Sequence, residues 1–143
     1  MTTDLEAVLT RVRTGMPPYW SKIGMVPERV NRVGHLVMSL AMREDLGTRR
    51  HEVMHGGALA SLIDATAGGA VTSLQEDGDE SWGGQATLDL NVTYLNAATT
   101  DVTAEATVLR HSRTLAFVSV EVRDTAGELV AVGRATYAII RKR

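Results

Sequence analysis

The segment from Gly56 to Gln75 constrains the fold of this chain more than any other feature. Asp64 is its only charged residue, and apolar residues occur nearly all round the helix that it would form. This pattern is typical of a helix enclosed by other structure. A membrane-spanning helix needs about 20 apolar residues, whereas this segment includes four glycines, two serines and two threonines. We therefore expect a buried core helix from His55 to about Leu74, and no membrane partner.

Runs of alternating apolar and polar side chains lie on both sides of this helix. One run precedes it at residues 35–42, and four follow it at residues 85–95, 102–110, 114–123 and 128–140. Such alternation is typical of strands with one buried face, and the short connections between the last three runs suit hairpins. The sequence therefore predicts an α+β fold with an antiparallel sheet of five to six strands packed on one long helix.

The first 24 residues are predicted to form a helix and a lead-in. Residues 4–14 place four apolar side chains on one helical face after an acidic start. Gly15 and the following pair of prolines are expected to end this helix. We therefore divide the chain into an N-terminal lead-in over residues 1–24 and a single domain over residues 25–143.

Composition and charge exclude several classes of protein. The chain of 143 residues has no cysteine, which excludes disulfides, cysteine-ligated zinc and thiol nucleophiles. Its 15 basic and 17 acidic residues give a net charge of -2, which does not suit nucleic acid binding. The chain starts with acidic residues where a secretory signal needs basic ones, so we expect a cytoplasmic protein. It also contains no dinucleotide-binding or phosphate-binding glycine motif.

Residues 51–55 match the His-Glu-x-x-His signature of zinc hydrolases. That chemistry needs His51 and His55 on one face of a helix, with the glutamate between them as general base. Two glycines follow at once, where such a helix should continue, and a third ligand could only be guessed as Glu76 or Glu80. A zinc hydrolase is therefore the least favoured hypothesis for this chain.

A second pattern begins at the same histidine. Gly56 would open the long helix, whose first backbone N–H groups are free to stabilise negative charge on an oxygen. Asp64 follows Gly56 by a little over two helical turns, and an ionised aspartate in apolar surroundings needs a partner or a purpose. Its predicted neighbours on that face are all small: Ala60, Ser61, Ala67 and Gly68. Spacing alone leaves two hypotheses open, a reactive carboxylate or an aspartate that packs against a neighbouring chain.

Four segments of the sequence resemble the PaaI-like branch of the hotdog-fold acyl-CoA thioesterases. They are the His-Gly-Gly-x6-Asp core at residues 55–64 and the segments 86–98, 110–122 and 131–137. The resemblance runs from about residue 35 to the end of the chain. It implies a hotdog fold, in which the sheet wraps around one long central helix, and hydrolysis of an acyl-CoA to free acid and CoA without a metal or other cofactor. It also implies a homodimer at least, commonly a homotetramer, with sites between subunits.

The resemblance further implies roles for individual residues. Gly56 would donate its N–H to the thioester oxygen, and Asp64 would act as nucleophile or as general base on water. Thr87 would lie on the neighbouring subunit and orient the water. Four residues are expected to bind substrate: His55, Gly57, Arg110 and Arg113, of which the two arginines would contact the CoA phosphates.

One position departs from the family pattern. Relatives commonly have asparagine or glutamine six residues before the motif histidine, where this chain has Arg49. Either His51 fills that polar role, or Arg49 contributes its charge to catalysis, or activity is weak. A hotdog dimer that binds acyl thioesters without catalysis, or serves as a scaffold, is therefore the alternative hypothesis. The acyl group is not fixed, although 4% aromatic residues and six methionines favour a flexible aliphatic chain.

Overall fold

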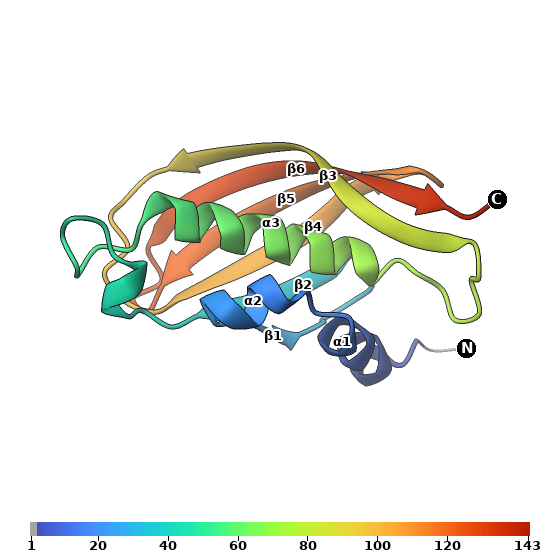
Figure 1. Cartoon of the computed structure of the whole chain (residues 1–143), viewed down its shortest axis with the longest axis horizontal. Helices are drawn as coiled ribbons and strands as arrows, with labels where there is room; N and C mark the ends of the chain where they lie inside the picture. Colours follow the sequence, from blue (N-terminus) through green and yellow to red (C-terminus); the bar gives the residue numbers. More distant parts are fainter. Residues whose placement is uncertain (1–2) are drawn as a thin grey trace.

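One antiparallel sheet of six strands curls around helix α3 in the computed structural model, which describes residues 3–143 (Figure 1). The chain runs through α1 (Leu5–Thr14), α2 (Pro18–Ile23), β1 (Met25–Arg29), β2 (His35–Leu40), a single 3-10 turn (Glu44–Leu46), α3 (Gly56–Thr72), β3 (Trp82–Tyr94), β4 (Val102–His111), β5 (Leu115–Asp124) and β6 (Leu129–Arg141). The strand order is β1-β2-β4-β5-β6-β3. The predicted α+β sheet around one long helix is confirmed.

Helix α3 lies against the concave face of the sheet and contacts every strand (Figure 1). Most of its residues are buried, as the near absence of charge predicts. Gly69 allows a close approach to the sheet, because a Cβ at this position would overlap the side chain of Leu36 on β2. No helix among the described residues has the length and apolar character needed to cross a bilayer.

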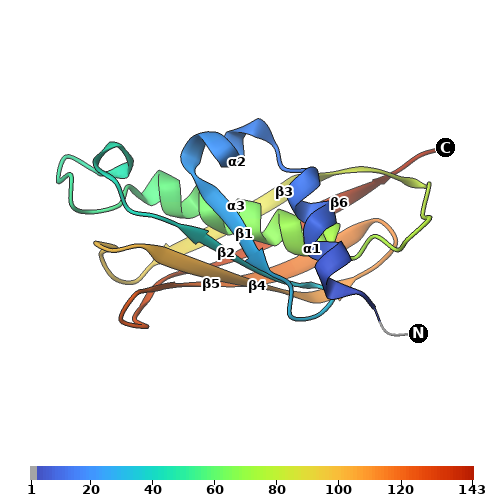
Figure 2. The same cartoon turned by 90° about the horizontal axis from the view of Figure 1, so that it is seen from below.

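The concave face of the sheet supplies the other half of the core. On β4, Val102, Ala104 and Ala106 are buried, whereas Thr103 and Glu105 between them are exposed. This is the period of two that the sequence predicts for a strand with one buried face. The first helix joins the same core through Val8, Leu9 and Val12, and α1 and α2 both pack against β1 (Figure 2).

Two elements are absent from the sequence prediction. Helix α2 starts at Pro18, in the proline pair that was expected only to end the preceding helix, because proline is well tolerated in the first turn of a helix. Strand β1 follows at the edge of the sheet, where Pro27 needs no ladder partner on its open side. Residues 1–2 of the predicted lead-in lie outside the described residues.

Strand β3 forms the other edge of the sheet, next to β6 alone. It is 13 residues long, begins at Trp82 rather than at residue 85, and none of its residues is fully buried. Its exposed side chains include Leu88, Leu90 and Tyr94. A long apolar edge strand with an unpaired backbone is a template for pairing with another chain.

Candidate active site

Helix α3 begins with a backbone amide that has no partner among residues 3–143. His55 is the N-cap, and its Nδ1 accepts a hydrogen bond from the N–H of Gly57 at 2.7 Å. The N–H of Gly56 donates no hydrogen bond within the described chain. A helix N-terminus carries partial positive charge, so this N–H can stabilise an oxygen that develops negative charge. Because Nδ1 of His55 accepts, the neutral ring keeps its proton on Nε2.

A pocket of about 330 Å³ opens beside this amide. It lies between the start of α3 and the end of β3, and its apolar lining consists of Val53, Met54, Leu59, Leu95, Ala97 and Ala98. Tyr94 also lines it and donates a hydrogen bond to the carbonyl oxygen of Gly56 at 2.7 Å. A Cβ on Gly56 would lie 3.1 Å from the Tyr94 ring, so a glycine is favoured at this close contact.

Asp64 is half-buried in the middle of α3 and is held by two hydroxyl groups of the same chain. Thr87 on β3 donates to its Oδ1 at 2.8 Å. Tyr137 on β6 donates to the same Oδ1 at 2.6 Å and contacts the Asp64 carbonyl oxygen at 2.7 Å. Thr87 therefore contacts Asp64 of its own chain, because β3 lies beside α3, and its expected action on a neighbouring subunit stays a prediction.

Tyr137 is a site residue that the sequence analysis missed. Its side chain is buried, and this burial, together with the hydrogen bond to Asp64, raises the pKa of the Tyr137 phenol well above its usual range. The phenol therefore stays protonated and donates its hydrogen bond. A tyrosine on the inward side of the last strand was the only available signal, and its partner is 73 residues away in sequence.

The small residues around Asp64 do not all share one open face. Ala60 and Ser61, on the preceding turn, are half-buried, whereas Ala67 and Gly68, on the following turn, are buried. A Cβ on Gly68 would lie 2.8 Å from the Tyr137 hydroxyl. Of the four small residues predicted around Asp64, only Ala60 and Ser61 are therefore partly exposed.

The sequence of this chain matches a family model over more than half of its length. The model of the thioesterase superfamily matches residues 51–131 of the 143 residues, a span of more than half of the chain that includes Gly56, Asp64 and Thr87. This chain belongs to the thioesterase superfamily.

Individual relatives agree with this assignment. Human acyl-coenzyme A thioesterase 13 is 30% identical over 106 residues, which cover 72% of this chain and 71% of the human protein. A conserved protein of Pseudomonas aeruginosa is 33% identical, with a TM-score of 0.77, and the match covers 90% of this chain and 98% of that one. The PaaI protein of E. coli is 18% identical over 96% of both chains with a TM-score of 0.82, and supports the hotdog fold alone.

The loop before α3 forms neither the zinc site that the His-Glu-x-x-His motif predicts nor a polar contact with Asp64. His51 lies in an exposed turn, and α3 begins only at Gly56, so the helix that a zinc-hydrolase motif needs is not formed across residues 51–55. The zinc hypothesis is therefore wrong. Arg49 is also exposed, and neither side chain makes a hydrogen bond within the described chain. A direct role of Arg49 or His51 beside Asp64 has no support within a single chain.

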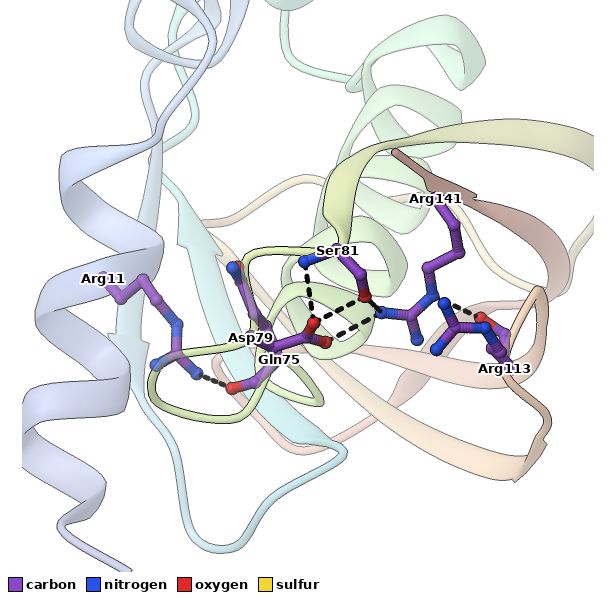
Figure 3. A network of polar contacts seen from close by, with 6 residues as sticks. All are labelled: Arg11, Gln75, Asp79, Ser81, Arg113 and Arg141. Carbon is purple, nitrogen blue, oxygen red and sulfur yellow. Dashed lines mark hydrogen bonds and ion pairs between the residues drawn. The ribbon is translucent and has the colours of Figure 1, made fainter. Parts of the chain in front are cut away.

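The two predicted phosphate-binding arginines lie at the hairpin between β4 and β5. Figure 3 shows that the hairpin is attached to the loop after α3: Arg141 donates to the carbonyl oxygen of Arg113 at 2.8 Å and to Asp79 at 2.8 Å. The pKa of Asp79 is lowered, first by its hydrogen bond from Ser81 and then by Arg141. The guanidinium groups of Arg110 and Arg113 have no hydrogen-bond partner among residues 3–143.

The Gly56 amide, the Asp64 carboxylate and the two arginines lie at different points along helix α3. Gly56 and Asp64 are eight residues apart, which is about 12 Å along a helix. The hairpin with Arg113 lies beyond the other end of α3 (Figures 1 and 3), and α3 is 17 residues or about 25 Å long. Within one chain, the amide, the carboxylate and the arginines therefore cannot all contact one small substrate.

Proposed function

We propose that this chain is an acyl-CoA thioesterase, which hydrolyses an acyl-CoA to the free carboxylic acid and CoA. The observation that carries the proposal is the carboxylate of Asp64, held through one oxygen by Thr87 and Tyr137 on an otherwise uncharged helix. Membership of the superfamily and similarity to a human acyl-CoA thioesterase support it. CoA is part of the substrate, and the proposed reaction uses no metal or separate cofactor.

The proposed chemistry divides between an amide and a carboxylate. The N–H of Gly56 donates to the thioester carbonyl oxygen and stabilises the negative charge that develops there. Asp64 either attacks the carbonyl carbon or removes a proton from the attacking water. If water attacks, the carbon–sulfur bond breaks, the oxygen of water ends in the carboxylic acid, and its proton is available to the CoA thiolate. If Asp64 attacks, the carbon–sulfur bond breaks to leave a mixed anhydride on Asp64 and the CoA thiolate. Water then cleaves this anhydride, which releases the carboxylic acid, regenerates the Asp64 carboxylate and supplies a proton to the thiolate. Thr87, hydrogen-bonded to Asp64, would orient the water or the carboxylate.

A homodimer is the smallest unit that can bring the amide and the carboxylate together. Because Gly56 and Asp64 of one helix are about 12 Å apart, one thioester needs Gly56 from one chain and Asp64 from another. We propose that two copies of β3 pair antiparallel at the open edge, since this is the long apolar edge of the sheet. Such a pair would place the two α3 helices antiparallel, with each helix start opposite the other chain's carboxylate. Pairing of dimers into a tetramer is part of the same proposal.

The antiparallel dimer also gives the arginines a place in the site. The β4–β5 hairpin of one chain would lie at the end of the dimer where the partner's α3 begins. Arg110 and Arg113 would then bind the CoA phosphates near His55 and Gly57 of the other helix start. The link from Arg141 to the Arg113 carbonyl fixes the hairpin while leaving the Arg113 guanidinium free.

Replacing Arg113 with alanine is expected to raise KM for acyl-CoA by about 5- to 20-fold with kcat nearly unchanged. A phosphate contact is present in both the ground state and the transition state, so its loss weakens binding rather than chemistry. The matched control is Arg123→Ala, because Arg123 is an exposed arginine that pairs with Glu121 away from this hairpin. Steady-state kinetics measure both variants, and an unchanged KM for Arg113→Ala would exclude Arg113 from the site.

The pocket beside Gly56 suggests the acyl group. Its lining is aliphatic apart from Tyr94 and Asn96, and an acyl chain attached to a thioester at the Gly56 amide could enter it. We propose an aliphatic acyl group rather than an aryl group.

The experiment that tests the function is release of free thiol from a panel of aliphatic and aryl acyl-CoAs, with and without a chelator. Chelator-resistant hydrolysis that is fastest with aliphatic substrates is expected. No hydrolysis of any substrate would instead favour a hotdog dimer that binds acyl thioesters without catalysis, which is the alternative that Arg49 at the usual amide position supports.

A further inference from the structure

The carboxylate of Asp64 has an asymmetric environment that its proposed chemistry does not by itself require. Both hydroxyl donors, Thr87 and Tyr137, reach Oδ1. Oδ2 accepts no hydrogen bond from any residue between 3 and 143. One oxygen is therefore anchored and the other is left for a reaction partner.

Tyr137 makes the more constrained of the two contacts. Its side chain is 5% exposed, and its hydroxyl lies within hydrogen-bond distance of both the carboxylate and the backbone carbonyl oxygen of Asp64. The hydroxyl thus lies between the helix backbone and the side chain that branches from it. Thr87, in contrast, belongs to the exposed edge strand β3 and makes no contact with the helix backbone; it lies opposite Tyr137 in the pairing of β3 with β6, so that the two hydroxyl groups meet at Oδ1.

The sequence of α3 makes room for this hydroxyl. Gly68 lies one turn after Asp64, and a Cβ at that position would come within 2.8 Å of the Tyr137 hydroxyl and 3.3 Å of its Cζ. A contact below 3.0 Å cannot be accommodated without movement of the tyrosine. Glycine in the middle of a helix is less stable than alanine, and the contact with Tyr137 explains why glycine occurs at this position.

We propose that Tyr137 is a positioning residue, which fixes the Asp64 side chain through Oδ1 so that Oδ2 is the oxygen that reacts. An aspartate side chain without such partners samples several rotamers, and a misplacement of about 1 Å at a reacting group can reduce the rate about 100-fold. This inference rests on the proposed function of Asp64. Tyr137 itself does not touch the substrate.

Tyr137→Phe removes the hydroxyl and keeps the buried ring. We expect kcat to fall by about 10- to 100-fold with KM within about threefold, because substrate contacts are unchanged while the carboxylate loses its orientation. Loss of thermal stability with unchanged kcat, or equal changes in kcat and KM, would overturn the inference.

Tyr19→Phe is the matched control. Tyr19 on α2 makes a hydroxyl contact with Ser61 at 2.8 Å, on the same helix and one turn before Asp64, but has no contact with the carboxylate. The same chemical change at this position is expected to leave kcat within about twofold. An equal loss in both variants would overturn a specific role for Tyr137.

Gly68→Ala provides an independent variant. In the single variant, the added methyl group displaces the Tyr137 hydroxyl. We expect kcat to fall to a level similar to that of Tyr137→Phe. In the double variant the hydroxyl is already absent, so the second change should add little, which makes the effects strongly non-additive. Independent, multiplicative losses would overturn the proposed link between Gly68, Tyr137 and Asp64.

A carboxyl ¹³C NMR spectrum separates this inference from the proposed function. The position of the Asp64 carboxyl signal is expected to change in Tyr137→Phe and to stay unchanged in Tyr19→Phe, because only the first variant loses a hydrogen bond to that carboxylate. This measurement needs no substrate. If the wild type released no thiol from any acyl-CoA, the proposed function would fail, and the signal would still support or overturn the contact between Tyr137 and Asp64.

Discussion

Asp64→Asn is expected to lower kcat by about 100- to 10,000-fold while leaving the fold and the oligomeric state intact. Asparagine has the same shape, and its carbonyl oxygen can still accept the hydrogen bonds from Thr87 and Tyr137 that Oδ1 accepts now. The amide nitrogen would take the place of Oδ2, where it can neither remove a proton from water nor attack a carbonyl carbon. The structure therefore separates the chemical role of Asp64 from its packing role.

Thiol release and size-exclusion chromatography measure the two roles of Asp64 on the same sample. Asp77→Asn is the matched control, because Asp77 is exposed in the loop after α3 and forms an ion pair with Arg11, far from Asp64 in sequence. It should retain full activity. A variant of Asp64 that is unfolded or dissociated, or one that keeps its turnover, would contradict a catalytic role and support the packing hypothesis that the spacing alone left open.

The parts of the fold that sequence predicted are those with a local cause. Helix α3 has its bounds within two residues of the prediction because its apolar composition and the glycines at its start are continuous in sequence. Strands β4 to β6 follow from the alternation of side chains that one buried face requires. Strand β2 was also predicted from alternation, although the structure buries side chains on both of its faces. Helix α2 was missed because its proline was interpreted only as a helix stop. Strand β1 was not predicted, since it is a short edge strand of five residues that includes a proline.

The residues of the candidate site also fall into two groups, those that local sequence predicts and those that depend on tertiary packing. Gly56 and Asp64 belong to one helix, so their spacing could be predicted from helical geometry. Tyr94 and Tyr137 contact these two residues from strands that are 38 and 73 residues away in sequence. No periodicity in the chain indicates such pairs, because they depend on which strand lies beside which flank of the helix. Tertiary packing therefore supplies the residues that hold the predicted groups.

Mixing two inactive variants is expected to restore activity if each site uses two chains. Gly56→Pro removes the backbone N–H at the first helical position, where proline is tolerated, and the N-cap His55 already has the extended ψ of 137° that suits the residue before proline. Loss of one oxyanion donor should lower kcat about 100- to 1,000-fold. Gly56→Ala is its steric control, because it adds a Cβ against Tyr94 but keeps the N–H.

Gly56→Pro and Asp64→Asn chains are unfolded together and refolded, so that about half of the dimers are mixed. In each mixed dimer, one of the two sites has both native groups. Shared sites therefore predict roughly a quarter of wild-type activity. A site within one chain predicts no recovery at all.

Refolding wild type with an excess of the Gly56→Pro/Asp64→Asn double variant gives the opposite test. Shared sites lose nearly all activity in mixed dimers, because each site then lacks one group, whereas sites within one chain keep the full activity of every wild-type protomer. Recovery in the first mixture together with loss in the second would establish that Gly56 of one chain acts with Asp64 of the other.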